Sequence, residues 1–320
     1  MIAIIIGLTI GFGLPIQTTI NSKLRDAFGS PFLSSLISFI IGTIFLAIVV
    51  VASGQVLIVG MTTISSQPWW LWLGGVFGVI YLTSNILLFP KIGSVQTVIF
   101  PVLGQILMGL LIDNGGWFSS AVQRLTVSRG LGALLVLIGV IVTVALPNYL
   151  ESRKALVDVQ AKADVQGSGK DGLNSWLWRL WGVFAGMLSA SQTAINGHLG
   201  IVVGSAIKSA FISFLIGTVL LIIIVLIMRP KVRYKETTDQ HRWWMWIGGV
   251  IGSLYVLGNA YLAPTIGTGL AVVIVLIGLM AGSLLIDQFG WLDAKRNPIT
   301  PIQIIGLITM ILGVVVIRLI

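Results

Sequence analysis

The sequence predicts an all-α integral membrane protein whose ten transmembrane helices form two inverted five-helix repeats. Three features lead to this prediction: the composition, the number of long apolar runs and an internal repetition of polar residues. Of the 320 residues, 56% are hydrophobic and 9% are charged, whereas about 25% of the residues in a soluble protein carry charge. A water-soluble core cannot bury this much apolar surface, so the bilayer must surround most of the side chains.

Ten apolar runs are long enough to cross about 30 Å of hydrocarbon as helices. They lie at 2–20, 32–53, 69–88, 92–112 and 129–147, and again at 176–195, 207–228, 243–263, 266–286 and 301–318. The segment between the two sets is charged and ends in a Gly/Ser stretch. We therefore predict a first repeat at 1–148, a cytosolic linker at 149–174 with a short helix in its first half, and a second repeat at 175–320.

The basic residues predict how these spans are oriented, because cytoplasmic loops of membrane proteins are enriched in Lys and Arg. With the N-terminus outside, 15 of the 19 Lys and Arg residues fall on the cytoplasmic side. The exceptions are Arg124, Arg129, Lys208 and Arg318. We therefore expect both termini outside and the linker 149–174 in the cytoplasm. The formal charge of +9 then reflects membrane topology, and we expect no nucleic-acid partner.

Polar residues recur along the chain at a nearly constant spacing. The aligned pairs are Gln17 with Gln192, Asn21 with Asn196, Tyr81 with Tyr255, Asn85 with Asn259, and Asp113 with Asp287. Such matches at one register are hard to obtain by chance, so the two halves are copies of one unit. Each half has an odd number of spans, so the second must insert upside down. Inverted repeats place a substrate site at their interface and permit alternating access.

The two copies have diverged at three positions within the spans. Gln105 aligns with Leu279, Pro101 with Val275 and Pro15 with Ala190. A polar site at Gln105 is therefore expected in one half only. The prolines free backbone carbonyls inside their helices, and broken helices often mark transporter sites, although proline is also commoner in membrane helices than in soluble ones.

The repeated unit carries a recognisable series of motifs. It reads Q-x-x-x-N-x-x-L, then S-F-x-x-G-T, then W-W-x-W-x-G-G-x-x-G-x-x-Y, then P-x-x-G, then L-L-x-D-x-x-G-W. This unit resembles the YdcZ-type family of the drug/metabolite transporter (DMT) superfamily over both halves, apart from 149–174. Members occur as single five-helix chains that pair antiparallel and as fused ten-helix chains, and this sequence is similar to the fused form. The resemblance implies a plasma-membrane exporter and leaves the substrate open.

Nine polar residues within the spans are candidates for the substrate path. They are Gln17, Asn21, Tyr81, Asn85, Gln105, Gln192, Asn196, Tyr255 and Asn259. Eight of them form i,i+4 pairs on one helix face, and polar side chains in lipid-bathed helices turn toward the bundle interior. One interpretation is that they line a central path or form gates. The other is that they hydrogen-bond neighbouring helices, each bond contributing about 0.6–2 kcal/mol.

Several functions find no support in the sequence. All ten carboxylates lie at span ends, in loops or in the linker, whereas related small multidrug-resistance proteins carry a glutamate in the first helix. Asp113 and Asp287 are the nearest intramembrane candidates, and a structural role is favoured for both. With two histidines and no cysteine, we expect no metal and no cofactor. The sequence shows no arrangement of a nucleophile with a base, so we do not expect an enzyme.

We therefore expect a secondary transporter, an exporter of a small metabolite or drug-like molecule, that works by alternating access. The expected location is the plasma (inner) membrane of a prokaryote, with the lipid bilayer and a small-molecule substrate as partners. A monomer and a homodimer are both compatible with the sequence. The alternative function is a non-transporting membrane receptor or scaffold subunit.

Overall fold

The structure, a computed structural model, describes residues 1–160, 173–230, 243–293, 296 and 298–319, and this part of the chain is helical with no strand. The α-helices are α1 (Ile2–Phe28), α2 (Pro31–Ala52), α3 (Met61–Ser66), α4 (Gly74–Gly115), α5 (Val127–Gln160), α6 (Leu173–Val202), α7 (Ala206–Met228), α8 (Gly248–Ile266), α9 (Thr268–Phe289) and α10 (Pro301–Leu319). Short 3-10 turns lie at Trp69–Trp72, Trp117–Ser119, Trp243–Trp246 and Trp291–Asp293. Residues 161–172 of the predicted linker lie outside the described residues, and its first part, up to Gln160, continues helix α5.

Long apolar helices dominate this fold. Among the described residues, seven helices are long and apolar enough to cross a membrane, and a further apolar helix, Pro301–Ile317, is shorter. The predicted all-α membrane class is therefore confirmed. The labels α1 to α10 do not correspond one to one with the ten predicted spans, because α3 has only 6 residues and α4 covers two of them. The count of ten spans stays a prediction.

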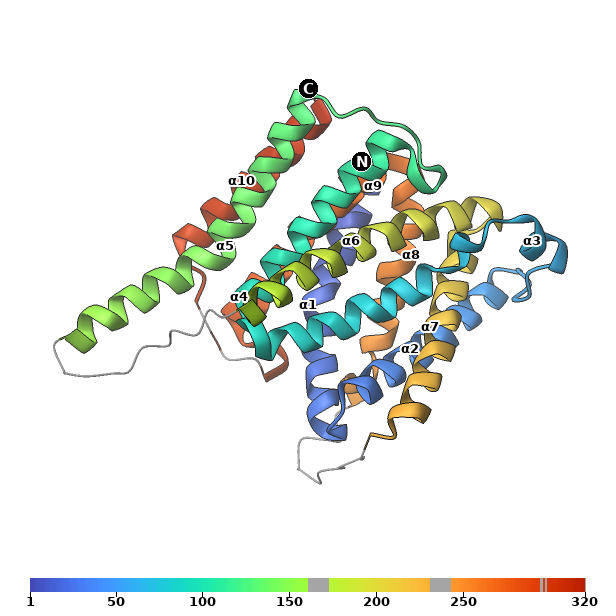
Figure 1. The fold of residues 1–320 in the computed structure, drawn as a ribbon, viewed down its shortest axis with the longest axis horizontal. Coiled ribbons are helices and arrows are strands. Elements are labelled where there is room, and N and C mark those ends of the chain that lie inside the picture. Colours follow the sequence, from blue (N-terminus) through green and yellow to red (C-terminus); the bar gives the residue numbers. More distant parts are fainter. Residues whose placement is uncertain (161–172, 231–242, 294–295, 297, 320) are drawn as a thin grey trace.

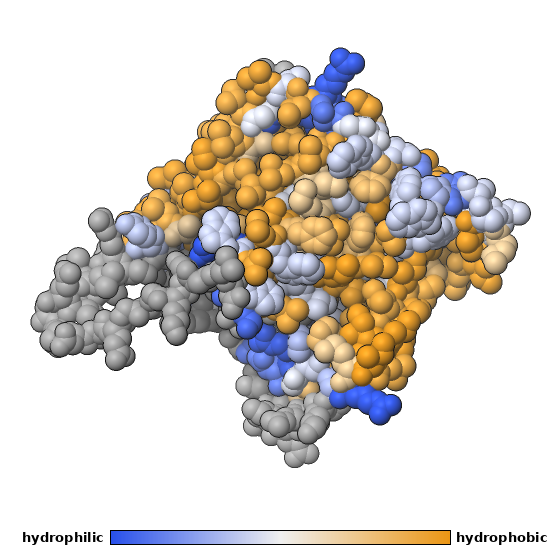
Figure 2. All heavy atoms as spheres, viewed as in Figure 1, coloured by the Kyte–Doolittle hydropathy of each residue, from blue (hydrophilic) through white to orange (hydrophobic). Residues whose placement is uncertain are grey.

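The outer faces of the helices are aliphatic, as a lipid-facing surface requires. On α2 the exposed side chains Ile40, Ile44 and Ile48 follow one another at four-residue spacing, which places them on one stripe of the helix. On α10, Ile304 and Ile308 repeat the pattern. Figure 2 shows apolar side chains covering α5 and α10 and the exposed side of α7. A surface of this kind would drive aggregation in water and is stable against lipid tails.

Helix α4 folds back on itself, although it is one uninterrupted helical run of 42 residues. Gln105 Nε2 donates a hydrogen bond of 2.9 Å to the hydroxyl of Tyr81, 24 residues earlier. In a straight helix, 24 residues span about 36 Å, so the chain must reverse between these residues. Figure 1 shows the two arms of α4 diverging from a sharp bend. The two arms correspond to the predicted spans 69–88 and 92–112.

The last helices of the two halves, α5 and α10, pack antiparallel along their length (Figure 1). A Cβ built on Gly132 would lie 2.6 Å from the carbonyl oxygen of Gly313, and one on Gly139 would lie 2.7 Å from that of Gly306. Gly132 aligns with Gly306 in the repeat, and Gly139 aligns with Gly313. The contact is therefore reciprocal between equivalent helices that run in opposite directions. Small residues at a helix contact allow this close backbone approach.

Equivalent residues of the two halves also touch each other directly. The hydroxyls of Thr43 and Thr218 are 2.8 Å apart, and the stacked rings of Phe39 and Phe214 have centroids 4.8 Å apart. A residue can contact its own counterpart only next to a two-fold axis, as in an isologous dimer. The pseudo-two-fold axis of the molecule therefore passes between α2 and α7.

The α5–α10 contact gives a first testable prediction. Replacing Gly139 with valine puts a side chain into the backbone of α10, and overpacking of this kind costs about 1–3 kcal/mol. We expect a lower melting temperature for the detergent-solubilised protein, measured as loss of the monodisperse species on heating. Gly130→Val is the matched control, since a Cβ at Gly130 of the same helix meets no atom within 4 Å. Equal melting temperatures for the two variants would contradict the packing described here.

Candidate functional site

A group of neutral polar side chains lies where the two halves meet. We define the polar cluster as Tyr81, Asn85, Gln105, Ser189, Tyr255 and Asn259. Its best-defined member is Gln105, which is 6% exposed and whose amide nitrogen donates to the hydroxyls of Tyr81, at 2.9 Å, and Ser189, at 3.2 Å. Because Ser189 belongs to α6, these bonds connect the first half of the chain with the second.

The remaining members extend the cluster across the pseudo-two-fold axis. The Tyr81 hydroxyl is also paired with the Asn85 side chain, and the hydroxyl of Tyr255 interacts with the side chains of Ser189 and Asn259. Tyr81 and Tyr255 are equivalent residues, and Gln105 and Ser189 lie between them in the chain of contacts. The structure thus brings five of the nine predicted path residues together. All are neutral, so the cluster offers hydrogen bonds and aromatic faces without formal charge.

Ser189 is the member that the sequence analysis missed. It is 3% exposed and looks like an ordinary small residue in an apolar helix. The alignment of the two halves could have identified Ser189, because it pairs this polar residue with Leu14, just as it pairs Gln105 with Leu279. The hydrogen-bonded pair on one side of the axis therefore corresponds to two leucines on the other. Gln105 and Ser189 therefore have no polar counterpart across the axis.

The four other candidates lie in notches formed by glycines of the opposite half. A Cβ on Gly248 would lie 2.7 Å from Asn21 Oδ1, and one on Gly78 would lie 2.6 Å from Gln192 Nε2. By the same test, Gln17 fills the notch at Gly252 and Asn196 fills the notch at Gly74. The glycines are therefore required for the amides to fit.

The two asparagines also hydrogen-bond within their own half. The hydroxyl of Ser38 donates to Asn21 Oδ1 over 2.6 Å, and Asn196 Nδ2 donates to the hydroxyl of Ser213 over 3.2 Å. Ser38 and Ser213 are equivalent in the repeat, so the arrangement is present twice. For the Asn pair, this geometry favours the interpretation as helix-packing contacts.

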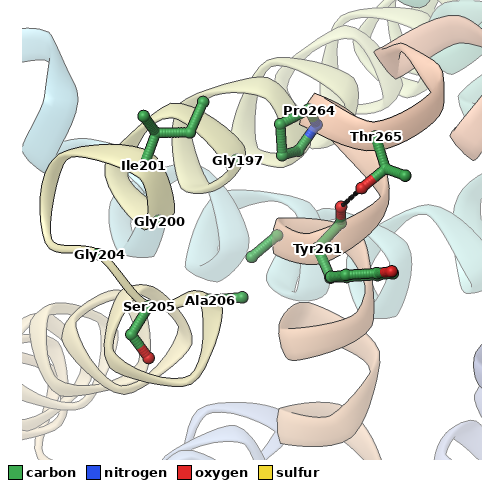
Figure 3. A pocket seen from close by; sticks show the side chains of 10 residues that line it. Gly197, Gly200, Ile201, Gly204, Ser205, Ala206, Tyr261, Pro264 and Thr265 are labelled. Carbon is green, nitrogen blue, oxygen red and sulfur yellow. Dashed lines mark hydrogen bonds between the residues drawn. The ribbon is translucent and has the colours of Figure 1, made fainter.

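A surface groove lies apart from the polar cluster. It has a volume of about 310 Å³ and lies between the C-terminal ends of α6 and α8 and the start of α7. Figure 3 shows Gly197, Gly200 and Ile201 of α6 facing Tyr261, Pro264 and Thr265 of α8 across it. The Thr265 hydroxyl bonds the Tyr261 carbonyl of its own helix. None of the nine predicted residues lines the groove, so the candidate site is placed at the polar cluster. Among the described residues, no three His, Asp or Glu side chains come together as metal ligands.

The fold and the cluster define a multi-span helical membrane protein assembled from two related halves around a shared polar interior. The sequence matches the family described as "Putative inner membrane exporter, YdcZ" over residues 2–142 and 177–316. The two matched segments are the two halves, and together they cover most of the chain. The protein therefore belongs to the YdcZ family, which confirms the resemblance drawn from the motifs. The description of the family is that of a membrane exporter, which is not an enzyme class.

Solved structures share the same fold. One, titled "Crystal structure of protein", aligns with 99% of this chain and 96% of its own chain at a TM-score of 0.68 and 16% sequence identity. At this identity the likeness concerns the fold alone. No curated protein sequence matches the chain.

The placement of Asn21 gives a prediction that separates packing from transport. Removing its side chain with Asn21→Ala leaves the buried Ser38 hydroxyl without its acceptor, which costs on the order of 1 kcal/mol in a membrane protein. We expect a lower melting temperature and unchanged substrate affinity. The control is Thr18→Ala, an exposed position on the same helix. A variant with full thermal stability and impaired substrate binding would instead assign Asn21 to the path.

Proposed function

We propose that the protein is a secondary transporter that exports a small, neutral, hydrogen-bonding molecule by alternating access between its two halves. The single observation that carries this proposal is the set of hydrogen bonds from Gln105 to Tyr81 and Ser189. These groups meet at the contact between the halves, where Gln105 and Ser189 are buried. Buried polar groups in membrane proteins are costly and mark substrate pathways more often than other positions do.

The proposed topology is ten spans with the second half inverted relative to the first. The antiparallel contact of α5 with α10 supports it, because these are the equivalent last helices of each half. The bend of α4 supports the count, since it resolves one helical run into two arms. The excess of Lys and Arg on one side supports termini outside and a cytoplasmic linker. In this orientation the pseudo-two-fold axis lies in the plane of the membrane.

Alternating access follows from this symmetry. If the halves are alike in structure and opposite in direction, each can adopt the conformation of the other. Exchanging the two conformations moves the opening from one side of the membrane to the other, while a site on the axis stays in place. Tyr81 and Tyr255 are equivalent residues that both belong to the polar cluster, which makes this cluster the element that both open states would share.

The chemistry of the cluster supports a neutral substrate. Its members supply two phenol hydroxyls, one serine hydroxyl and three carboxamides, which together donate and accept hydrogen bonds in many directions. A charged substrate would have to leave water for a site with no charge to balance its own. The phenol rings add apolar faces, as in most small-molecule sites.

A flux measurement with a matched pair of variants tests this function. Purified protein in liposomes is screened for saturable flux of neutral sugars, nucleosides, amides and amine drugs, and the best substrate is then measured with Gln105→Leu. Loss of a neutral hydrogen bond is expected to raise KM roughly 2- to 10-fold. Gln55→Leu makes the same chemical change in the loop after α2 and should leave flux unchanged.

Two results would overturn the proposal. The absence of saturable flux for every compound would favour the alternative of a receptor or scaffold subunit. Equal flux for Gln105→Leu and the unmodified protein would remove the cluster from the path and leave the site unassigned.

A further inference from the structure

Asp113 makes the most deeply buried charged contact among the described residues. It lies at the end of α4 and is fully buried, and its Oδ2 accepts a hydrogen bond from Arg129 Nη2 over 2.8 Å. Arg129, on α5, is itself only 8% exposed. The proposed transport site does not use this pair. Removing one partner of a buried ion pair leaves an uncompensated charge in surroundings that solvate it poorly, so such a pair is costly to break.

The same carboxylate reaches into the second half of the chain. Its two oxygens accept from the backbone N–H groups of Thr268, at 2.8 Å, and Gly269, at 3.0 Å, which begin α9. The first N–H groups of a helix have no partner within the helix, and a carboxylate is favoured there. Asp113 therefore caps a helix of the opposite half.

Two glycines make this approach possible. A Cβ on Gly269 would lie 2.9 Å from Asp113 Oδ2, and one on Gly267 would lie 3.1 Å from it. Gly267 also has a φ of 87°, which side chains other than glycine rarely adopt. Any larger residue at these positions would push the carboxylate away from α9.

The segment between α4 and α5 adds hydrogen bonds to both Asp113 and Arg129. Arg129 Nη1 donates to the carbonyl of Gln123 over 2.6 Å, while the N–H of Gln123 donates to the carbonyl of Asp113 over 2.7 Å. The Gln123 amide also reaches the carbonyl of Ile266, at 3.4 Å, at the end of α8. Arg129, Asp113 and Gln123 together hold α4 and α5 to the α8–α9 junction. We call these three residues, with the Thr268 and Gly269 amides, the latch.

The second half keeps the carboxylate and the turn before its last helix at the equivalent positions and has no cation at the position of Arg129. Asp287 aligns with Asp113, and Thr300 aligns with Thr126, so each half keeps the carboxylate and the turn before its last helix. In each turn the threonine Oγ1 accepts from the backbone N–H three residues later, at Arg129 over 3.2 Å and at Gln303 over 3.4 Å. The position of Arg129 is thus held by Gln303 in the second half.

Gln303 is engaged differently from Arg129. Its Oε1 turns back to accept from the backbone N–H of Thr300 over 2.8 Å. The second half therefore has glutamine at the position where, in the first half, a guanidinium neutralises the carboxylate. In a molecule with two related halves, such a difference favours one of the two conformations that the halves could exchange.

We propose that the latch closes the α4–α9 side of the protein, and that arginine at 129 against glutamine at 303 makes the conformation closed on this side the resting state. The proposal rests on the proposed alternating access for its role in transport. Opening this side requires the Asp113 carboxylate to leave both Arg129 and the α9 amides. In the proposed orientation, the closed side faces outward.

A single cysteine reports whether this side is open. The chain has no cysteine, so Thr268→Cys introduces the only thiol. Thr268 is fully buried and its hydroxyl has no hydrogen-bond partner, so the substitution removes no hydrogen bond. The readout is the labelling rate with a membrane-impermeant maleimide, added to each side of sealed vesicles in turn and without substrate.

Arg129→Gln in this background removes the cation. We expect labelling from one side only, at a rate at least about tenfold faster than in the Thr268→Cys parent. Arg124→Gln is the matched control, since Arg124 is exposed in the same segment, and its labelling rate should equal that of the parent. An unchanged rate for a monodisperse Arg129→Gln protein would overturn the proposal.

A second variant acts on the opposite side of the molecule and breaks no buried contact of the latch. Gln303→Arg puts a cation at the position equivalent to Arg129, in the half that carries Asp287, and should favour the other conformation, so that Thr268→Cys labels faster although its surroundings are unaltered. No change in rate would overturn the assigned bias. The labelling result is separate from transport: faster labelling without flux for any substrate would keep the latch and reject the transporter, whereas flux with unchanged labelling would reject the latch alone.

Discussion

Close approach of helix backbones across the contact between the two halves is the constraint on which the rest of this structure depends. Lipid offers helices no hydrophobic gain for association, so contact area and interhelical hydrogen bonds must hold them together. The glycines at 132, 139, 306 and 313 let α5 and α10 touch backbone to backbone, and Gly248 and Gly78 receive amides from the opposite half. Because each contact recurs with the halves exchanged, the packing itself creates the pseudo-two-fold axis. The polar cluster and the latch both take their positions from it.

Departures from this symmetry mark the parts of the molecule with the most specific chemistry. Hydrogen-bonded Gln105 and Ser189 stand where the other side of the axis has Leu279 and Leu14, and ion-paired Arg129 stands where the second half has Gln303. At each of these positions one copy carries the side chain that makes the contact and the other copy carries a different residue type. In the proposed mechanism the symmetry of the halves provides two equivalent conformations, and these sequence differences make the two conformations unequal. Membership of the YdcZ family fits such a mechanism, because the description of that family is an inner membrane exporter. The transport proposal starts from this description.

The sequence predicted the helical membrane class, the two halves and the polar character of Tyr81, Tyr255 and Gln105, because periodic apolar runs and rare polar residues are local signals. It also predicted separate spans at 69–88 and 92–112, which the reversal within α4 supports. Ser189 was missed because the role of a serine in an apolar helix depends on its partner in a neighbouring helix. That partner, Gln105, lies 84 residues away in the sequence. Asp113 was recognised as a helix-end residue, but its partners, the amides of Thr268 and Gly269, lie more than 150 residues away. Contacts of this range depend on tertiary packing, which no local pattern encodes.

The central claim is that the polar cluster is reached from both sides of the membrane in turn. Ser189→Cys tests it directly, since the chain contains no other thiol and cysteine is close in size to the serine it replaces. The measurement is the rate of reaction with an impermeant thiol reagent added to one side of sealed vesicles while the other side is quenched. Alternating access predicts reaction from either side and protection by a transported substrate in both cases. Reaction from a single side under all conditions, with no protection by any substrate, would contradict it.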